Sequence, residues 1–440
     1  MKIGFVSLGC SKNLVDTEVM LKRLADAGYT ITPDETEADI IVVNTCGFIQ
    51  SAKEEAIDNI LDVAWLKKNR ALKGIIATGC LVERYREQVL EEMPEVDAVL
   101  GTGSYHKIVE AAEAVARGEK YASFEDKNAA PLGGERIVTT PPYTAYLKVA
   151  EGCDNRCTYC AIPLIRGRMR SRRMEDVVAE AKSLEKIGVK ELNIIAQDTS
   201  RYGLDLYGKY MLPELVQKIL AETQIPWIRL LYLYPDKITD ELVAVIRDND
   251  RVCKYVDLPI QHVNDTVLAR MNRHGDGAVV RAAVEKIRRE IPGVTLRTTA
   301  IVGFPGETEA QFAELCEFVK ETGFDRFGAF TYSPEEGTPA AEFPDQIDEQ
   351  VKQDRYDTLM AVQLEVSEKK MQEKIGDVIE VLCEGYDPVA GVQYGRSRAD
   401  APDVDGKVYF TSAKKLPEGV FVNVKITKAL DYDLFGEAVR

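Results

Sequence analysis

Short apolar runs that alternate with amphipathic helical patterns dominate the first part of the chain. Apolar runs occupy residues 2–8, 39–45 and 73–79, and each of them precedes a helical pattern. Continuous apolar runs of this length predict strands buried on both faces, and their alternation with helices predicts a parallel sheet. We therefore expect residues 1–120 to form an α/β domain, followed by a linker over residues 121–142, which are polar and rich in Pro and Gly.

The same alternation resumes over residues 143–344. The predicted strands are YTAYLKVA, ELNIIAQ, WIRLLYL, YVDLPI, TLRTTAIVG and RFGAFTY, with helical patterns between them. About six such βα units, instead of the usual eight, predict a partial, open β/α barrel. Residues 345–374 predict a long charged helix with an apolar stripe that connects to the C-terminal part. Residues 375–440 contain five short strand patterns separated by turn signals, which predicts a small five-stranded β-barrel.

Composition places the chain among water-soluble globular proteins. Hydrophobic residues make up 45% and charged residues 29% of the 440 residues, which is ordinary for that class. No stretch approaches the roughly 20 apolar residues of a membrane span, and MKIGFVSLGC reads as a strand rather than a signal peptide. We expect a cytoplasmic protein without a membrane partner. Its net charge of −16 favours basic partners over phosphate backbones at long range.

Three clustered cysteines carry the candidate chemistry. The stretch EGCDNRCTYC places Cys153, Cys157 and Cys160 directly after the first predicted barrel strand, at the end where β/α barrels hold their active sites. A cytoplasmic chain is not expected to use its nine cysteines as disulfides, and its three histidines are scattered. The pattern favours a thiolate site for iron–sulfur or zinc over three unrelated buried cysteines. Three protein ligands leave one coordination position for another ligand, as in catalytic metal sites.

A second set of cysteines follows the predicted strands of the N-terminal domain. Cys10, Cys46 and Cys80 each stand directly after one strand and beside a glycine. Because the carboxyl ends of parallel strands share one edge of a sheet, these three thiols can meet there. The alternative is that each is a small core residue, the usual fate of an isolated cysteine. The other cysteines fall inside regular patterns and are expected in the core: Cys253, Cys316 and Cys383.

The CxxxCxxC loop at this place in a partial barrel resembles the radical S-adenosylmethionine enzymes. The resemblance implies that Cys153, Cys157 and Cys160 hold a [4Fe–4S] cluster whose fourth iron binds S-adenosylmethionine, the source of a 5′-deoxyadenosyl radical. The segment AIVGFPGETE (300–309) is similar to the glycine motif of the superfamily, although alone it also fits an ordinary strand-to-helix turn. By this resemblance the cofactor-binding residues are Tyr159, Gln197, Gln261, Gly303, Pro305 and Gly306.

Two sets of three cysteines in this order resemble the methylthiotransferase family. The resemblance rests on LGCSKNLVDTEVM, NTCGFI, ATGC, EGCDNRCTYCAIPLIRGRMRSR and a small C-terminal β domain, termed TRAM, and it covers nearly the whole chain. It implies a second [4Fe–4S] cluster on Cys10, Cys46 and Cys80, whose open iron carries a sulfur species. One S-adenosylmethionine would methylate that sulfur, and a second would generate the substrate radical to which the methylthio group couples. A reductant protein of the flavodoxin or ferredoxin type is the expected electron donor.

Within this family the sequence is more similar to the ribosomal branch, RimO, than to the tRNA branch. LGCSKNLVD and DLPIQHVND carry this similarity, whereas MNRHGDG departs from the expected turn and leaves contacts near His274 undecided. Residues 375–440 contain eight Lys and Arg against eleven Asp and Glu, which disfavours phosphate and favours a basic protein. The branch implies methylthiolation of the β-carbon of an aspartate in a basic small-subunit ribosomal protein, S-twelve. Modification of a tRNA adenosine, as in MiaB-like enzymes, is the alternative, and tRNA is not expected as a partner.

A basic run, RGRMRSRR, follows the cysteine loop. Its ordinary interpretation is the solvated start of a helix. Its place beside the cysteine loop raises the alternative that one of its arginines steadies the substrate carboxylate. The candidates are Arg166, Arg168, Arg170, Arg172 and Arg173.

Overall fold

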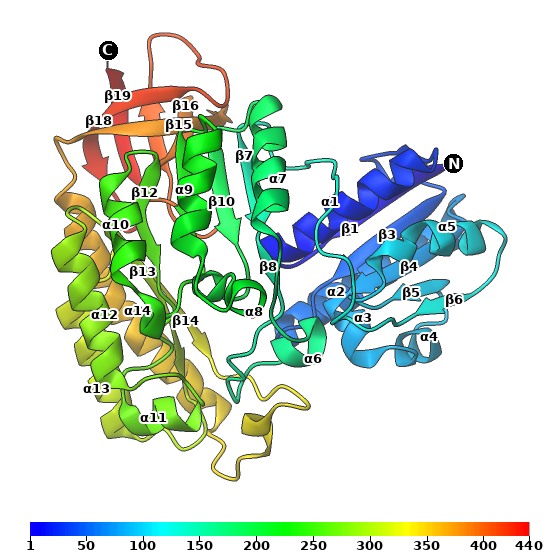
Figure 1. Ribbon diagram of the computed structural model, residues 1–440, viewed down its shortest axis with the longest axis horizontal. Helices are drawn as coiled ribbons and strands as arrows, with labels where there is room; N and C mark the ends of the chain where they lie inside the picture. The colour runs from blue at the N-terminus through cyan, green and yellow to red at the C-terminus, as the bar shows by residue number, and fades with distance from the viewer. Residues whose placement is uncertain (440) are drawn as a thin grey trace.

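The computed structural model describes residues 1–439 and begins with a six-stranded parallel sheet that has helices on both faces (Figure 1). The strand order is β2-β1-β3-β4-β5-β6. The strands are β1 (Lys2–Ser7), β2 (Thr30–Ile31), β3 (Ile40–Thr45), β4 (Gly74–Gly79), β5 (Ala98–Leu100) and β6 (Tyr121–Ser123). The helices are α1 (Ser11–Asp26), η1 (Glu35–Glu37), α2 (Gln50–Asn69), α3 (Cys80–Tyr85), α4 (Gln88–Glu92), η2 (Tyr105–Lys107) and α5 (Ile108–Ala116). The predicted parallel sheet is thus confirmed.

Burial of the central strands explains the continuous apolar runs in the sequence. β3 and β4 are buried along their whole length. Because side chains alternate between the faces of a strand, Ile41 and Val43 pack with α2, whereas Ile40 and Val42 pack with α1 and α5. The strand β6 differs from the expectation, since Tyr121–Ser123 fell in the predicted linker but pairs with β5. None of its three residues is fully buried, so they carry no apolar signal.

The central part is an open six-stranded parallel sheet with β7 and β14 at its edges, in the order β14-β13-β12-β11-β10-β7. Its strands are β7 (Thr144–Lys148), β10 (Glu191–Ile195), β11 (Trp227–Leu230), β12 (Val252–Asp257), β13 (Thr295–Val302) and β14 (Arg326–Thr331). A small antiparallel pair is formed by β8 (Ala150–Glu151) and β9 (Arg170–Ser171). All six strands overlap predicted ones, although β12 begins before the predicted YVDLPI, and the partial β/α barrel expected from the sequence is confirmed.

The helices of this part lie mainly on the outer side of the sheet (Figure 1). They are α6 (Ile162–Arg166), α7 (Met174–Lys186), η3 (Thr199–Arg201), α8 (Leu204–Tyr207), α9 (Leu212–Glu222), η4 (Pro235–Lys237), α10 (Asp240–Asp248), α11 (Asp265–Arg270), α12 (Gly277–Glu290), α13 (Glu309–Thr322), η5 (Pro339–Glu342) and α14 (Glu349–Gln372). The long helix α14 packs along β14 and leads to the C-terminal part. Within residues 1–439, no helix combines the length and the apolar composition that a bilayer crossing requires.

The C-terminal part is a closed five-stranded barrel with the strand order β15-β16-β17-β19-β18. The strands are β15 (Val378–Asp387), β16 (Val392–Ser397), β17 (Val408–Thr411), β18 (Phe421–Ala429) and β19 (Leu434–Val439). Its core includes Val381, Phe410 and Val424. Each strand coincides with one of the five predicted patterns, which confirms the small β-barrel.

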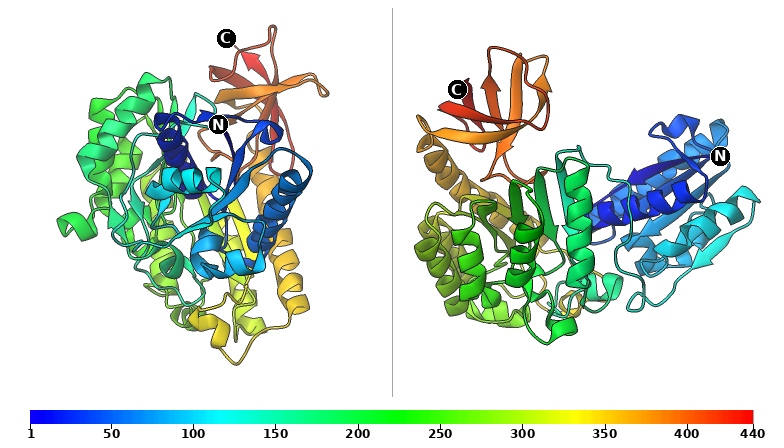
Figure 2. Two further views of the ribbon diagram at one scale, coloured as in Figure 1. Left: turned by 90° about the vertical axis from the view of Figure 1, so that its right-hand side faces the viewer. Right: turned by 45° about the horizontal axis from the view of Figure 1, so that its top comes forward.

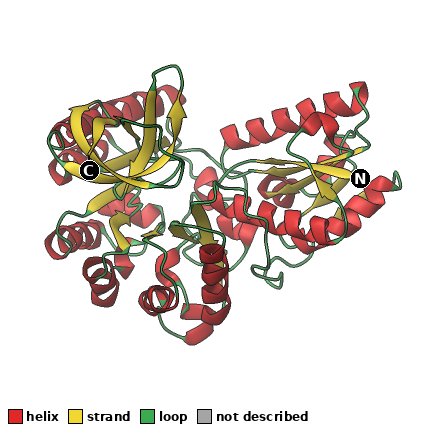
Figure 3. Ribbon diagram, turned by 90° about the horizontal axis from the view of Figure 1, so that it is seen from above, coloured by secondary structure: helices red, strands yellow, loops and turns green. Residues whose placement is uncertain are grey.

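Two interfaces place the outer parts around the central barrel, and Figures 2 and 3 show the resulting arrangement. The C-terminal barrel docks at the amino-terminal ends of the central strands, where Glu191 on β10 accepts a 2.6 Å hydrogen bond from Arg396 on β16. Trp227 on β11 packs there against Phe421, with ring centroids 4.9 Å apart. At the open edge, Lys148 on β7 pairs with Asp16 on α1 of the N-terminal sheet. The carboxyl ends of the central strands therefore face away from the C-terminal barrel.

Replacing Glu191 by glutamine should weaken the docking of the C-terminal barrel. Burial alone would raise the pKa of Glu191, but the guanidinium groups of Arg396 and Arg229 outweigh it and lower the pKa to about 2, from 4.5. A carboxylate with a lowered pKa stabilises the folded state above pH 4.5, and this stability is lost as the pH falls toward 2.

We expect Glu191→Gln to reduce the free energy of unfolding in urea by about 3–5 kcal/mol near neutral pH, because the buried guanidinium of Arg229 loses its counterion and that of Arg396 keeps only Glu384. The variant should also lose the share of Glu191 in the decline in stability between pH 4.5 and 2, while the share of Glu151 remains. Glu317→Gln, at an exposed position on α13, is the matched control and should leave both quantities unchanged. A Glu191→Gln protein as stable as the control would contradict this account of the interface.

Candidate active site

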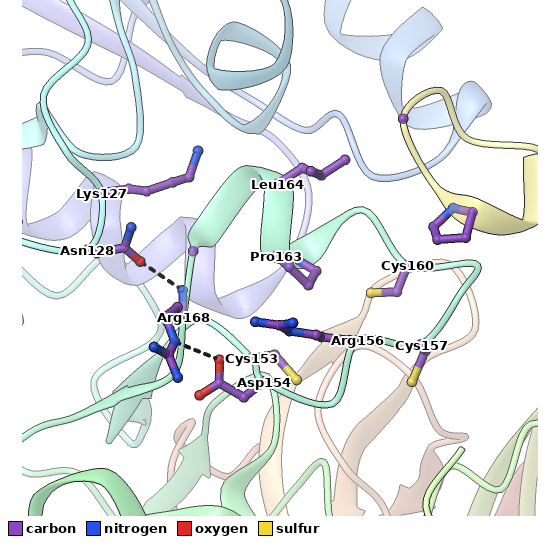
Figure 4. A pocket seen from close by; sticks show the side chains of 13 residues that line it. Lys127, Asn128, Cys153, Asp154, Arg156, Cys157, Cys160, Pro163, Leu164 and Arg168 are labelled. Carbon is purple, nitrogen blue, oxygen red and sulfur yellow. Dashed lines mark hydrogen bonds and ion pairs between the residues drawn. The ribbon is translucent and has the colours of Figure 1, made fainter. Parts of the chain in front are cut away.

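The three clustered cysteines lie on the loop between β8 and α6, at the carboxyl end of the central sheet. Cys153, Cys157 and Cys160 line one cavity of about 400 Å³, and Figure 4 shows the three side chains around it. Other walls come from Lys127 and Asn128 and from the start of η5. The structure therefore brings the three predicted ligands together in one open site.

A glycine fixes the shape of this loop. Gly152 has a φ angle of 77°, and a Cβ atom there would lie 2.1 Å from the carbonyl oxygen of Arg168. The next amide, of Cys153, donates to the carbonyl oxygen of Gly167 at 3.2 Å. Only glycine combines this left-handed conformation with so close an approach. The pair Gly-Cys, rather than the cysteine alone, therefore determines where the first thiol stands.

The surroundings of the loop affect the charge of its thiols. Burial raises the pKa of Cys153 to about 12 and also raises the pKa of Cys160 above its usual value. The sulfur of Cys157 lies 3.8 Å from the hydroxyl of Tyr234 and 3.9 Å from Nη1 of Arg273. Metal binding must therefore displace protons from these thiols, and the guanidinium of Arg273 offsets part of the negative charge that results.

Tyr159, between the last two cysteines, lies against an apolar cluster. It packs against the cluster that contains Phe304 and Tyr332, and its hydroxyl lies 3.5 Å from Nη1 of Arg273. Burial raises the pKa of Tyr159, so the ring stays neutral. A flat apolar surface next to the cysteine loop suits an aromatic base. The contact of Tyr159 with a cofactor remains a prediction.

Gln197 and Gln261 each have a buried side-chain oxygen that finds no hydrogen-bond donor within residues 1–439. Gln197 follows β10, and its amide group donates to Glu151 at 2.6 Å. Gln261 follows β12 with a φ angle of 69° and forms an isolated bridge with Ala300 on β13. Leaving a buried acceptor unpaired costs stability, so the two oxygens mark places that suit a ligand with hydrogen-bond donors, such as an amino group.

The glycine motif after β13 has a packing role. Gly303 and Gly306, on either side of Pro305, have φ angles of 72° and 75°. A Cβ atom on Gly303 would lie 2.4 Å from Lys352 on α14, and one on Gly306 would lie 2.2 Å from Asp345. Side chains of the chain itself fill the space beside these glycines, as the strand-to-helix turn interpretation expects. Their contact with a cofactor remains a prediction.

The second set of cysteines lies together at one edge of the N-terminal sheet. Cys10 precedes α1, Cys46 follows β3 and Cys80 begins α3, after three strands that are neighbours in the sheet. A Cβ atom on Gly9 would lie 3.1 Å from the sulfur of Cys46. Burial raises the pKa of Cys46 and raises that of Cys80 to about 12. The remaining cysteines lie apart from both sets: Cys253 and Cys383, which are buried, and Cys316, which is partly buried.

One short helix, α6, lies between the two sets of cysteines. It begins two residues after Cys160, and Ala161 and Ile165 pack against Cys80. At its end, Arg166 places Nη2 3.4 Å from the sulfur of Cys80. The two sets therefore lie on either side of α6, at the junction of the N-terminal sheet and the central barrel.

Four buried charges hold this junction together. Arg166 and Lys148 both pair with Asp16 and Glu151, and the distance from Lys148 to Glu151 is 2.7 Å. Burial alone would raise the pKa of Glu151, but Lys148 and Arg166 outweigh it and lower the pKa to about 2. Sequence reasoning missed this ionic cluster. Its available signal was a lysine and a glutamate inside the otherwise apolar pattern YLKVAEG.

The basic run after the cysteine loop is therefore not a solvated helix start throughout. Arg166 is only 3% exposed and Arg172 only 7% exposed. Arg172 pairs with Glu180 at 2.6 Å, and Arg166 belongs to the ionic cluster. Because both guanidinium groups already bind carboxylates of this chain, neither is available to steady the carboxylate of a substrate.

Three family models match successive parts of the chain. Residues 2–101 match the model described as uncharacterized protein family UPF0004. Residues 147–319 match the radical SAM superfamily, and residues 375–439 match the TRAM domain.

Named relatives match the chain over its whole length. The ribosomal protein uS12 methylthiotransferase RimO of Desulforamulus reducens is 50% identical, over 100% of this chain and 99% of that protein. The RimO protein of Geobacter sulfurreducens is also 50% identical, over 100% of this chain and 98% of that protein. The chain belongs to the RimO family. As a member it is a radical SAM methylthiotransferase, with an iron–sulfur cluster and S-adenosylmethionine as cofactors.

Solved structures of other radical SAM enzymes share the fold of this RimO family member. The methyltransferase TsrM of Kitasatospora setae is 14% identical, with a TM-score of 0.57 over 77% of this chain and 73% of that chain. The cobalamin-dependent enzyme OxsB is 11% identical, with a TM-score of 0.51 over 82% of this chain and 56% of that chain. At such low identity the likeness shows the fold alone.

The residues at both sites suit iron–sulfur clusters. Each set offers three thiols, the soft ligands that such clusters take. Within residues 1–439, no three His, Cys, Asp or Glu side chains are arranged to hold one metal ion. A cluster does not require that arrangement, because each thiolate binds a different iron. The donor sets therefore fit a cluster better than they fit a zinc ion.

In the iron-free protein, Cys80 should react with iodoacetamide far more slowly than in the unfolded chain. Its pKa is about 12 in the folded protein, against about 8.5 for a free cysteine, so the reactive thiolate is scarce. We expect the rate near neutral pH to fall by more than about 100-fold, as measured by mass spectrometry of peptides. Cys10, which is exposed, is the internal control and should react readily in the same sample. Equal rates for the two cysteines would contradict the buried placement of Cys80.

Proposed function

We propose that this chain adds a methylthio group to the β-carbon of an aspartate in the small-subunit ribosomal protein uS12. The observation that carries the proposal is the pair of three-cysteine sets on either side of α6. The full-length similarity to RimO proteins, whose name states uS12 as the substrate, supports the same conclusion.

Each set of cysteines would hold one [4Fe–4S] cluster. The cluster that binds S-adenosylmethionine would use Cys153, Cys157 and Cys160. The second cluster would use Cys10, Cys46 and Cys80. Together with S-adenosylmethionine, the bound groups supply a hydrogen-abstracting radical and a methylthio sulfur. The proposed contacts to S-adenosylmethionine are Tyr159, Gln197, Gln261, Gly303, Pro305 and Gly306, and the unpaired buried oxygens of the two glutamines are consistent with such contacts.

The residues between the two sets hold the sites in a fixed relation. Arg166 contacts Cys80 on one side and pairs with Glu151, which precedes the cysteine loop, on the other. Asp16 fastens α1, and with it the region of Cys10, to the same ionic cluster. This arrangement supports transfer of a group between two sites whose separation does not change. A flavodoxin- or ferredoxin-type protein is proposed as the reductant, and the cytoplasm, where ribosomes work, as the location.

The C-terminal barrel has one feature that favours a second candidate substrate, tRNA. Tyr409 stacks on Phe435 with ring centroids 5.1 Å apart, and Lys428 lies over the same Phe435 ring. Lys407 lies over the neighbouring ring of Tyr394. Aromatic rings interleaved with cations are typical of surfaces that bind single-stranded nucleic acid. A tRNA adenosine is therefore the alternative substrate to test.

The surface of the C-terminal barrel is also less acidic than its composition indicates. Asp400 is buried against Arg326, and Asp405 is buried near Arg297. These two carboxylates neutralise cations of the central barrel and contribute little to the outer surface. The charge of this barrel therefore does not decide between the substrates, and the proposal of uS12 rests on the RimO relatives.

Incubation of the reconstituted protein with S-adenosylmethionine, a reductant and either purified uS12 or bulk tRNA separates the two substrates. We expect mass spectrometry to find one hydrogen replaced by a methylthio group on an aspartate of uS12 and no change in the tRNA. A methylthiolated adenosine in the tRNA, together with unmodified uS12, would overturn the proposal in favour of the alternative.

Iron analysis tests the two-cluster assignment independently of the substrate. We expect about eight irons per chain after anaerobic reconstitution, and about four in the Cys10→Ala, Cys46→Ala, Cys80→Ala triple variant, since each set would hold one four-iron cluster. Cys316→Ala, outside both sets, is the control and should keep the full iron content. An unchanged iron content in the triple variant would show that the N-terminal set holds no cluster.

A further inference from the structure

Lys12 is a buried cation without a carboxylate partner. Its side chain stands on the first turn of α1, two residues after Cys10, and the residue is 7% exposed. Buried lysines are almost always paired, because the loss of hydration is expensive. Within residues 1–439, no carboxylate lies within ion-pair distance of Lys12, although the nearby cations Lys148 and Arg166 have two each. Its Nζ atom is not among the buried polar atoms sealed from solvent.

The ammonium group of Lys12 lies over an aromatic ring. Nζ lies 3.0 Å from the centre of the Tyr232 ring. Tyr232 follows β11 with a φ angle of 62°, and its amide donates to Asp257 at 2.9 Å. A left-handed conformation at a tyrosine is strained and persists only where the surroundings enforce it. The ring therefore holds the ammonium group in place, but a cation–π contact offsets only part of the desolvation cost.

The contact between Lys12 and Tyr232 joins the two segments that lead to the two sets of cysteines. On one side it belongs to the turn that begins at Cys10. On the other side Tyr232 is followed two residues later by Tyr234, whose hydroxyl lies 3.8 Å from the sulfur of Cys157. The ammonium group of Lys12 therefore lies where the segment that begins at Cys10 meets the segment that contacts Cys157.

We propose that Lys12 binds the side-chain carboxylate of the substrate aspartate and thereby holds the adjacent β-carbon between the two cysteine sets. This inference rests on the proposed function and names the residue that recognises its substrate. In aspartate the β-carbon is bonded directly to the carboxylate carbon, so fixing the carboxylate also fixes the reacting carbon. The first turn of α1 contains no acidic residue, and its partial positive charge attracts the same anion. An asparagine of the same shape would lack the charge that Lys12 needs.

Binding measurements with two forms of uS12 test this assignment without any turnover. One form is wild-type uS12, and the other has the modified aspartate, once mapped by mass spectrometry, replaced by asparagine. We expect the reconstituted wild-type chain to bind the aspartate form about 10- to 100-fold more tightly, as measured by fluorescence anisotropy, since that is the typical value of a hydrogen bond to a charged group. In Lys12→Met this preference should fall to about onefold. The Lys12 substitution and the replacement of the aspartate remove the same ion pair, so their effects on binding are not additive.

Three further proteins complete the design. Lys12→Gln repeats the loss of charge with a side chain that stays polar, and Lys12→Arg should retain part of the preference. Lys22→Met, on the outer end of α1, is the matched control and should keep the full preference. Lys12 could instead only stabilise the position of α1 through Tyr232. Lys12→Met and Lys12→Gln would then bind both forms of uS12 more weakly by the same factor. The preference for the aspartate form would be retained, and this result would overturn the proposal.

The result for the wild-type chain separates this inference from the function on which it rests. Methylthiolation of uS12 together with an unchanged preference in the Lys12 variants would overturn the role of Lys12 alone. Failure of the wild-type chain to bind and modify uS12 would overturn the proposed function, and the role of Lys12 with it.

Discussion

The four charges buried where α1, β7, β8 and α6 meet determine how the two cysteine sets face each other. Removing four ionised groups from water is costly, and the cost is recovered only when every charge has its counterions in good geometry. Asp16 comes from the N-terminal sheet, whereas Lys148, Glu151 and Arg166 come from the central barrel. Neither part is electrically complete alone. The arrangement of the site therefore depends on the two parts folding against each other.

The fold class was predictable because its central strands are buried on both faces. In such strands consecutive residues are apolar, as in β3, so the strand can be recognised without knowing which distant residues pack against it. The edge strand β6 shows where this reasoning ends. Its residues are polar or half exposed, and they become a strand only because β5 offers unpaired backbone groups. Such a strand forms through a tertiary contact, so no local pattern in the sequence predicts it.

The same distinction separates the parts of the site that the sequence predicted from those it did not. Cysteines after neighbouring parallel strands must lie at one edge, so the grouping of Cys10, Cys46 and Cys80 follows from topology. The burial of Arg166 does not, because its partner Asp16 lies 150 positions earlier in the chain. A charged run looks alike in sequence whether water or a distant carboxylate neutralises it. Lys12 was missed because its burial also depends on a distant residue, the ring of Tyr232.

The depth of Lys12 has a consequence for what the protein can recognise. In the complex that we propose, the short side chain of the aspartate reaches the ammonium group of Lys12 only if the substrate backbone itself enters the junction. A helix or an inner strand is too thick to do so, and its backbone hydrogen bonds would have to break. The substrate residue therefore has to stand at the tip of a thin, projecting loop. Among the many aspartates of a ribosome, the shape of the surrounding backbone would then exclude most of them, before the charge of the carboxylate could contribute.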